Sequence, residues 1–209
     1  MRIAREGYPL ILTVGALAVV AFVLGWEFVG SLLVLVTVAV AGFFRDPERI
    51  IPAGENLIVA PADGKVVSIA PANDGDMFSG SATRISIFLS PLDVHINRVP
   101  VTGKIDEVRY QRGSFLAAYE EAASERNEQN GLRVVDSAGR SIGVVQIAGV
   151  LARRIVCRVT RGDTLARGER FGLIMFGSRT DTYLPQGCSV EVVEGQRVKG
   201  GETVLGRFV

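Results

Sequence analysis

Three short segments of this chain combine reactive side chains with residues that favour tight turns. The segment PADGKV at 61–66 carries Asp63, LSPLDVHINRVP at 89–100 carries His95, and FGSRTD at 176–181 carries Ser178. A carboxylate, an imidazole and a hydroxyl are the parts of a catalytic set in which an oriented base activates a nucleophile. His95 is the only histidine among 209 residues, so a mechanism that needs an imidazole must use it.

Each segment also has an ordinary structural explanation when it is taken alone. Asp63 before Gly64 is a common turn signal, and a single histidine often has a structural role. Gly177-Ser178 is not distinctive, because the chain has further Gly-Ser pairs at 30–31, 80–81 and 113–114. Only the combination of the three segments indicates a catalytic site, and its geometry must come from the fold.

The N-terminal region has the composition of a membrane anchor. Residues 9–44 are almost wholly apolar, with Glu27 as their only charge. One helix of this length would run roughly 54 Å, against about 30 Å of hydrocarbon. It would also place Glu27 near mid-bilayer, which costs about 2.5–3.5 kcal/mol. A break at 25–27 avoids both problems, so we expect a hydrophobic helical hairpin, with segments 9–26 and 28–44, as a membrane anchor over residues 1–49.

The charges that flank this hairpin predict its orientation. Arg2 and Arg5 precede it, and Arg45 and Arg49 follow it. Because positive residues favour the cytoplasmic side, we expect both ends, and the domain that follows, on the cytoplasmic face of the cell membrane. The rival interpretation is a signal peptide cleaved after residues 39–41, but the apolar run is much longer than a signal core.

Residues 50–209 have the composition of a β domain. Short β-branched runs alternate with glycine and proline, which predicts a mainly β (α+β) fold of antiparallel sheets. The expected strands are 57–60, 65–70, 84–89, 104–110, 133–136, 141–147 and 153–159.

One stretch of this domain differs. Ser114–Arg126 is rich in alanine and glutamate, which predicts a short helix followed by a polar loop at 127–131. Its apolar side chains Phe115, Leu116 and Tyr119 either pack on the sheet or form a lipid-facing rim.

A weak internal repeat marks the C-terminal part. RGDTLARGERFG at 161–172 and EGQRVKGGETVLG at 194–206 share glycines at matching positions, where turns with positive φ are expected. The pattern is similar to the barrel-sandwich modules of lipoyl and biotinyl carriers. Lys199 lies inside the repeat and not in an exposed carrier turn, so we interpret the repeat as architecture.

Composition excludes several other functions. The formal net charge is only +1, so no basic field favours nucleic acid. Cys157 and Cys188 have neither metal-ligand spacing nor the pattern of a disulfide framework, which indicates two reduced thiols and no metal site.

Taken in order, the motifs resemble the phosphatidylserine decarboxylase proenzymes in their short, membrane-anchored form. The resemblance runs over nearly the full length, from GYPL and FFRDPER at the anchor to PADGKV, LSPLDVHINRVP and FGSRTD. It implies a zymogen that cuts itself autocatalytically between Gly177 and Ser178 into chains 1–177 and 178–209. It also implies a covalent pyruvoyl (pyruvate) cofactor made from Ser178. This lyase would convert phosphatidylserine to phosphatidylethanolamine and carbon dioxide through a Schiff base, in phospholipid biosynthesis.

The resemblance also suggests roles for single residues. As a hypothesis, His95 takes the Ser178 proton, Asp63 orients the imidazole, and His95 later protonates the substrate. Many longer members carry a second histidine three residues later, where this chain has Arg98. The two histidine roles must therefore fall on His95 or be filled otherwise.

Substrate binding has its own candidates. Arg98 and Phe115 are the candidate substrate-binding residues, together with Arg153, Arg154 and Arg158. Arginines could contact the substrate phosphate, and the alternative is that they are ordinary solvated residues on strands.

Two other functions stay open at this point. The chain could be a membrane-tethered, non-catalytic β module that acts as a carrier-like adaptor, supported by the repeat and the anchor. It could also be a pyruvoyl enzyme for a soluble amino acid, although a soluble substrate does not require an anchor. Homo-oligomer formation and full crossing of the membrane are left open as well.

Overall fold

The computed structural model describes residues 2–72, 76, 78, 81–118, 120, 122–150, 154–175 and 177–209. The chain divides into two compact units, Met1–Glu48 and Arg49–Val209. The first unit carries the apolar helices and the second carries the sheets, and each is described by itself.

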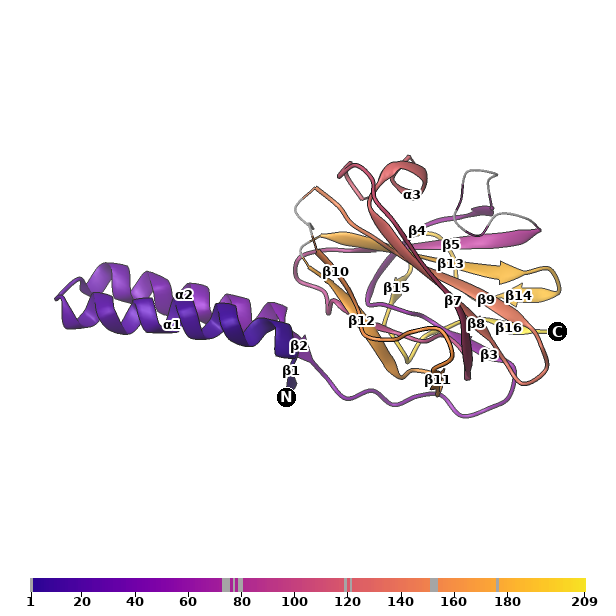
Figure 1. Cartoon of the computed structure of the whole chain (residues 1–209), viewed down its shortest axis with the longest axis horizontal. Helices are drawn as coiled ribbons and strands as arrows, with labels where there is room; N and C mark the ends of the chain where they lie inside the picture. The colour runs from indigo at the N-terminus through magenta and orange to yellow at the C-terminus, as the bar shows by residue number, and fades with distance from the viewer. Residues whose placement is uncertain are drawn as a thin grey trace. The chain divides into compact units, whose positions relative to one another are not determined.

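The first unit is a helical hairpin. A 3-10 turn, η1 (Arg5–Gly7), leads into α1 (Tyr8–Val23), and α2 (Glu27–Phe43) returns beside it (Figure 1). The chain reverses at Gly25, whose φ of 75° favours glycine. Two short strands, β1 (Arg2–Ile3) and β2 (Arg45–Asp46), pair at the base of the hairpin. The predicted hydrophobic hairpin and its break are therefore confirmed.

The hairpin packs tightly inside and is apolar outside. At Gly30, a Cβ atom would lie 2.8 Å from the Phe22 ring, so glycine allows the close approach of the two helices. Most outward side chains are exposed leucines, valines and aromatic residues, and Phe28 is 82% exposed. The helix from Arg5 to Val23 is long and apolar enough to cross a membrane, and α2 is slightly shorter.

The second unit is built around one large antiparallel sheet of eight strands. Its strands, in spatial order, are β11 (Thr164–Leu165), β7 (Gly103–Gln111), β8 (Gln129–Val135), β9 (Ser141–Ile147), β13 (Ser178–Pro185), β5 (Ala82–Leu89), β4 (Gly64–Pro71) and β15 (Arg197–Val198) (Figure 1). Isoleucines alternate with polar residues along β5, which gives the sheet one apolar face.

Two smaller antiparallel sheets complete this unit. One has the order β10 (Arg154–Cys157), β12 (Arg170–Met175) and β6 (Ile96–Arg98), and the other has the order β14 (Cys188–Val190), β16 (Val204–Phe208) and β3 (Leu57–Val59). Within the described residues the sheets stay open and do not close into one barrel. The predicted mainly β fold of antiparallel sheets is confirmed.

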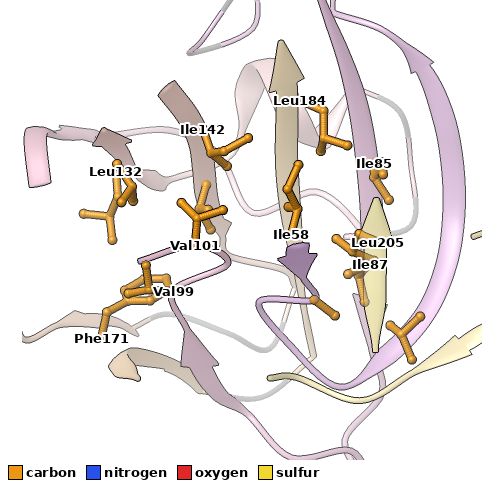
Figure 2. Close-up of a cluster of buried hydrophobic side chains, with 14 of the residues drawn as sticks. Ile58, Ile85, Ile87, Val99, Val101, Leu132, Ile142, Phe171, Leu184 and Leu205 are labelled. Carbon is orange, nitrogen blue, oxygen red and sulfur yellow. The ribbon is translucent and has the colours of Figure 1, made fainter. Parts of the chain in front are cut away.

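The main core lies between the sheets. Branched aliphatic side chains from many strands meet there, and most are wholly buried. The residues labelled in Figure 2 are Ile58, Ile85, Ile87, Val99, Val101, Leu132, Ile142, Phe171, Leu184 and Leu205. Each such buried side chain stabilises the fold by about 1.5–3 kcal/mol relative to exposure.

The glycine turns expected in the internal repeat are confirmed. Its glycines at 162, 168, 195 and 201 all have positive φ and lie in turns. The two copies make equivalent hydrogen bonds to two other equivalent segments, 60–66 and 99–105. The matching pairs are Gly162 N–H to Ile105 O and Gly195 N–H to Val66 O, then Gly168 N–H to Val99 O and Gly201 N–H to Ala60 O.

The predicted helix over Ser114–Arg126 is wrong for most of its length. Among the described residues of this stretch, only α3 (Ala123–Arg126) is α-helical, and β8 already begins at Gln129, inside the predicted polar loop. The buried Asn127 side chain accepts from the Leu116 N–H and donates to the Leu116 carbonyl, which holds residues 114–118 out of a helix. Long-range hydrogen bonds thus override alanine helix propensity here. Tyr119 lies outside the described residues.

Candidate active site

Ser178 lies where the chain crosses from one sheet to another. β12 belongs to the small sheet with β6, and β13 begins at Ser178 in the large sheet, opposite Leu89. Gly177, just before it, has a φ of 61°, in the region that favours glycine. The Ser178 side chain is fully buried, and its Oγ has no hydrogen-bond partner among the described residues.

A second glycine permits the close packing of this crossover. A Cβ atom on Gly149 would lie 2.3 Å from the carbonyl oxygen of Gly177 and 3.1 Å from the Ala118 Cβ. The first distance is shorter than real Cβ atoms show, and the second is tighter than most of their contacts. Only glycine at 149 therefore lets the backbone approach the carbonyl that precedes Ser178.

His95 lies beside the strand that leads into this crossover. It is buried, and its backbone carbonyl accepts a 3.3 Å hydrogen bond from Ile174 N–H on β12. Its Nδ1 is 3.0 Å from the carbonyl oxygen of Asp93. Because a carbonyl only accepts, Nδ1 must carry the proton. In the neutral ring, Nε2 is then the basic nitrogen.

The loop that orients His95 is itself held by side chains. The Asp93 carboxylate accepts from the Ser90 N–H and hydroxyl at 2.9 and 2.7 Å, and it pairs with Arg197. The backbone of Asp93 therefore presents its carbonyl to the imidazole in a defined position.

Asp63 has other partners than the predicted one. Arg49 donates to both of its carboxylate oxygens at 2.9 and 2.7 Å, and Gly200 N–H donates to Oδ1 at 2.8 Å. The expected hydrogen bond from the His95 imidazole to the Asp63 carboxylate is not among the contacts of the described residues.

The internal repeat explains this position of Asp63. In the equivalent segment 99–105, the residue that matches Asp63 is Thr102, whose hydroxyl accepts from Arg167 N–H at 3.0 Å. Asp63 therefore stabilises a turn of the copy at 194–206, and Thr102 stabilises the matching turn of the copy at 161–172.

Arg98 is buried, so the alternative of a solvated strand residue is wrong for it. Its guanidinium donates to the Gly168 carbonyl at 2.8 Å, and a Cβ atom on Gly201 would lie 3.0 Å from the Arg98 Cδ. Asp63 and Arg98 are therefore brought to the same 199–201 turn. Arg154 is exposed on β10, and Arg153 lies outside the described residues.

Phe115 lies near the crossover. It is partly buried and packs against the small cluster formed by Ala148 and Ile174. Asn127 fixes this segment, because its amide also donates to the Ala148 carbonyl at 2.7 Å. The structure thus brings together the chain around Phe115, Gly149 and the 177–178 crossover.

A buried ion pair anchors β13 beyond Ser178. Arg179 donates to Asp181 at 2.6 Å and to the Ser86 hydroxyl at 2.6 Å, and Ser124 donates to Asp181 at 2.6 Å. Burial raises the pKa of the neighbouring Tyr183 far above its usual range, and the Asp181 and Asp76 carboxylates add to the shift. Tyr183 is therefore a neutral phenol. The Arg179–Asp181 ion pair, through its hydrogen bonds to Ser86 and Ser124, ties the strand that begins at Ser178 to its neighbours.

Several functional features were not predicted from the sequence. Strands β12 and β13 were missed, as were the close approach at Gly149 and the Asp93 carbonyl as the partner of His95. The nearness of Asp93 to His95 in the sequence was the one signal available. Phe176 lies outside the described residues.

Comparison with known proteins identifies the class. The phosphatidylserine decarboxylase family matches residues 36–206. Similar relatives are phosphatidylserine decarboxylase proenzymes. One, from Syntrophus aciditrophicus, is 45% identical over 99% of this chain and 97% of its own length. Another, from Geobacter sulfurreducens, is 46% identical over 98% of this chain and 95% of its own length. A third, from Azorhizobium caulinodans, is 46% identical over 99% of this chain and 89% of its own length.

This chain belongs to the phosphatidylserine decarboxylase family. It is therefore an enzyme, and the carrier-like adaptor is not supported.

Proposed function

We propose that this chain cleaves itself between Gly177 and Ser178, and that the pyruvoyl group made from Ser178 decarboxylates phosphatidylserine. The observation that carries the proposal is the Ser178 hydroxyl, which is fully buried and has no partner among the described residues. Such a group is expected to have a function. It directly follows a glycine in the left-handed conformation, in a family whose relatives are named proenzymes.

Self-cleavage needs only residues of this chain and one water. Ser178 Oγ attacks the carbonyl carbon of Gly177, the peptide C–N bond breaks, and the nitrogen of Ser178 gains the proton. The resulting ester is eliminated when the Cα proton leaves and the Cβ–O bond breaks, which frees the Gly177 carboxylate. Water then replaces the nitrogen of the dehydroalanine, and ammonia departs.

His95 is the proposed base for the first step. Its Nδ1 is held by the Asp93 carbonyl, so Nε2 can accept the Ser178 proton. Asp63 is proposed as a positioning residue. It pairs with Arg49 and holds the 199–201 turn through Gly200 N–H. That turn packs against Arg98, the last residue of the strand that follows His95.

The pyruvoyl ketone, once formed, supplies an electron sink for loss of carbon dioxide. In that step His95 is the proposed donor of the proton that returns to the substrate α-carbon. We propose that Phe115 contributes an apolar wall beside the substrate, because it is partly exposed next to Ile174. Arg98 is proposed to act on substrate binding through the position of β6, since its guanidinium is bound to the Gly168 carbonyl.

The helical hairpin fits a lipid substrate. Its outward face is apolar and exposed, and about 0.8 kcal/mol per methylene keeps a diacyl lipid in the bilayer. We propose that the hairpin anchors the enzyme in the cell membrane, with the sheet unit on the cytoplasmic side. The arginines at both ends of the hairpin support this orientation.

The test is release of carbon dioxide by the full-length protein from phosphatidylserine in mixed micelles. Water-soluble glycerophosphoserine and free serine are the comparison substrates, and Ser178→Ala is the control variant. We expect release from the lipid by the wild type and none by Ser178→Ala. Equal turnover of free serine would contradict the lipid substrate, and equal rates for the two proteins would contradict the role of Ser178.

A further inference from the structure

Unpartnered hydroxyls line one face of β13. Ser178, Thr180 and Thr182 point to the same side of the sheet, because alternate residues of a strand share a face. All three side chains are fully buried, and none of their hydroxyl oxygens has a hydrogen-bond partner among the described residues. Ser178 is accounted for by the proposed reaction, and the other two hydroxyls are not.

A chain of buried amides reaches this face from three other strands, β8, β9 and β6. Asn130 Nδ2 donates to Gln146 Oε1 at 3.1 Å, and Gln146 Nε2 donates to Asn97 Oδ1 at 2.8 Å. Gln146 lies directly opposite Thr180 in the pairing of β9 with β13. The amide chain therefore places Asn97, from β6, over the row that contains Thr180.

The direction of this amide chain is fixed. Gln146 Nε2 also lies 3.3 Å from the backbone carbonyl of Val156, and a carbonyl can only accept. The nitrogen of Gln146 is therefore identified without ambiguity, and Asn97 must present its oxygen to it. Asn97 Nδ2 is then left as a buried donor, and it has no partner among the described residues.

Buried polar groups of this kind are usually satisfied by a ligand or an ordered water. Paired strands place Gln146 and Thr180 about 5 Å apart, and Thr180 and Ser178 lie about 7 Å apart along the strand. These spacings suit one bridging water better than a direct contact.

We infer that Asn97 and Thr180 are positioning residues that hold one water against the Ser178 hydroxyl. The water orients that hydroxyl toward the carbonyl carbon of Gly177. This inference rests on the proposed self-cleavage and adds two residues to it. The water donates to Ser178 Oγ as that oxygen gains negative charge, and it is not consumed in the attack. Hydrogen bonds to charged groups are strong enough for their loss to slow the step about tenfold to a hundredfold.

The experiment follows cleavage of the newly synthesised full-length precursor in lipid nanodiscs over time. Thr180→Val keeps the shape and removes the hydroxyl, Thr180→Ser keeps the hydroxyl, and Asn97→Leu removes the amide. Thr182→Val is the matched control, because Thr182 lies on the same strand and face and is equally buried, but farther from Ser178. Hydroxylamine, which cleaves the ester and leaves Ser178 unmodified, measures the attack separately from elimination.

We expect about tenfold or slower ester formation for Thr180→Val and Asn97→Leu, near-normal rates for Thr180→Ser, and less than about a threefold change for Thr182→Val. A purely structural role predicts instead that slower cleavage is accompanied by a lower thermal midpoint. Replacing an unpartnered buried hydroxyl by a methyl group should leave the thermal midpoint unchanged or higher, for both threonines. Slower cleavage without lost stability is thus the signature of positioning.

The outcomes separate this inference from the proposed function. If the wild type cleaves and both Thr180→Val and Asn97→Leu cleave at its rate, the water site is wrong and self-cleavage stands. Equal slowing by Thr180→Val and Thr182→Val would also overturn the inference. If the folded wild type never cleaves, the proposed function and this inference fall together.

Discussion

Replacing Gly149 by alanine would place a methyl group against the carbonyl that Ser178 is proposed to attack. The added Cβ would lie 2.3 Å from the Gly177 oxygen, and ordinary contacts of this kind begin at 3.4 Å. The carbonyl must therefore move by about 1 Å, and a displacement of that size can slow a reaction about a hundredfold. This corresponds to a barrier higher by about 2.7 kcal/mol.

The assay is the time course of precursor cleavage, read by gel and intact mass. Gly42→Ala is the control, because a Cβ at Gly42 meets nothing within 4 Å and its φ is not positive. Folding is compared in a Ser178→Ala background, where neither protein can be cut. If folded Gly149→Ala cleaves as fast as the wild type, the close approach has no role in the reaction.

Two further predictions concern stability, and thermal unfolding of the full-length protein in detergent checks both. Arg49→Met leaves the largely buried Asp63 carboxylate without its cation, so we expect a loss of about 3 kcal/mol, and adding Asp63→Asn should recover part of it. No loss in the single variant would contradict a structural role for the pair. Asp136→Asn should destabilise by about 1 kcal/mol or less at neutral pH. Burial raises the pKa of Asp136, but hydrogen bonds from Arg140 and Ala138 outweigh it and hold that pKa below its usual value. Because the pKa of Asp136 is lower in the folded state, its carboxylate contributes stability at pH values above the unfolded pKa of about 3.9. This contribution is lost as the pH falls through the folded pKa, so the stability difference between Asp136→Asn and the wild type must disappear in acid. A difference that persists there would refute the assignment.

The sequence predicted those strands that show regular alternation, and it missed the one that bears the site. β13 contains Arg179 and Asp181, which appear solvent-facing in a linear pattern. They are buried because Ser86 and Ser124, distant in the sequence, complete their hydrogen bonds. Long-range pairing of this kind leaves no local periodicity to detect.

The helix error has a related cause. Alanine and glutamate in 114–126 favour a helix locally, but Asn127 binds both backbone groups of Leu116 and the carbonyl of Ala148. These hydrogen bonds involve Asn127 and Ala148, which lie outside residues 114–126, so the helix propensity of that stretch could not reveal them.

For the candidate site, the sequence identified His95 and Ser178 through short motifs but could not give their neighbours. Asp63 lies at the 199–201 turn because of the internal pseudo-symmetry, in which Thr102 occupies the equivalent place beside Arg167. The orienting group for His95 is a backbone carbonyl, which carries no residue-type signal.

The most direct test of self-processing is the intact mass of the purified protein, with Ser178→Ala beside the wild type. We predict two wild-type chains that meet at Gly177, the smaller one lighter than a serine-started chain by the loss of ammonia. The alanine variant should remain whole. A single uncut wild-type chain, in a preparation shown to be folded, would contradict the proposed pyruvoyl enzyme.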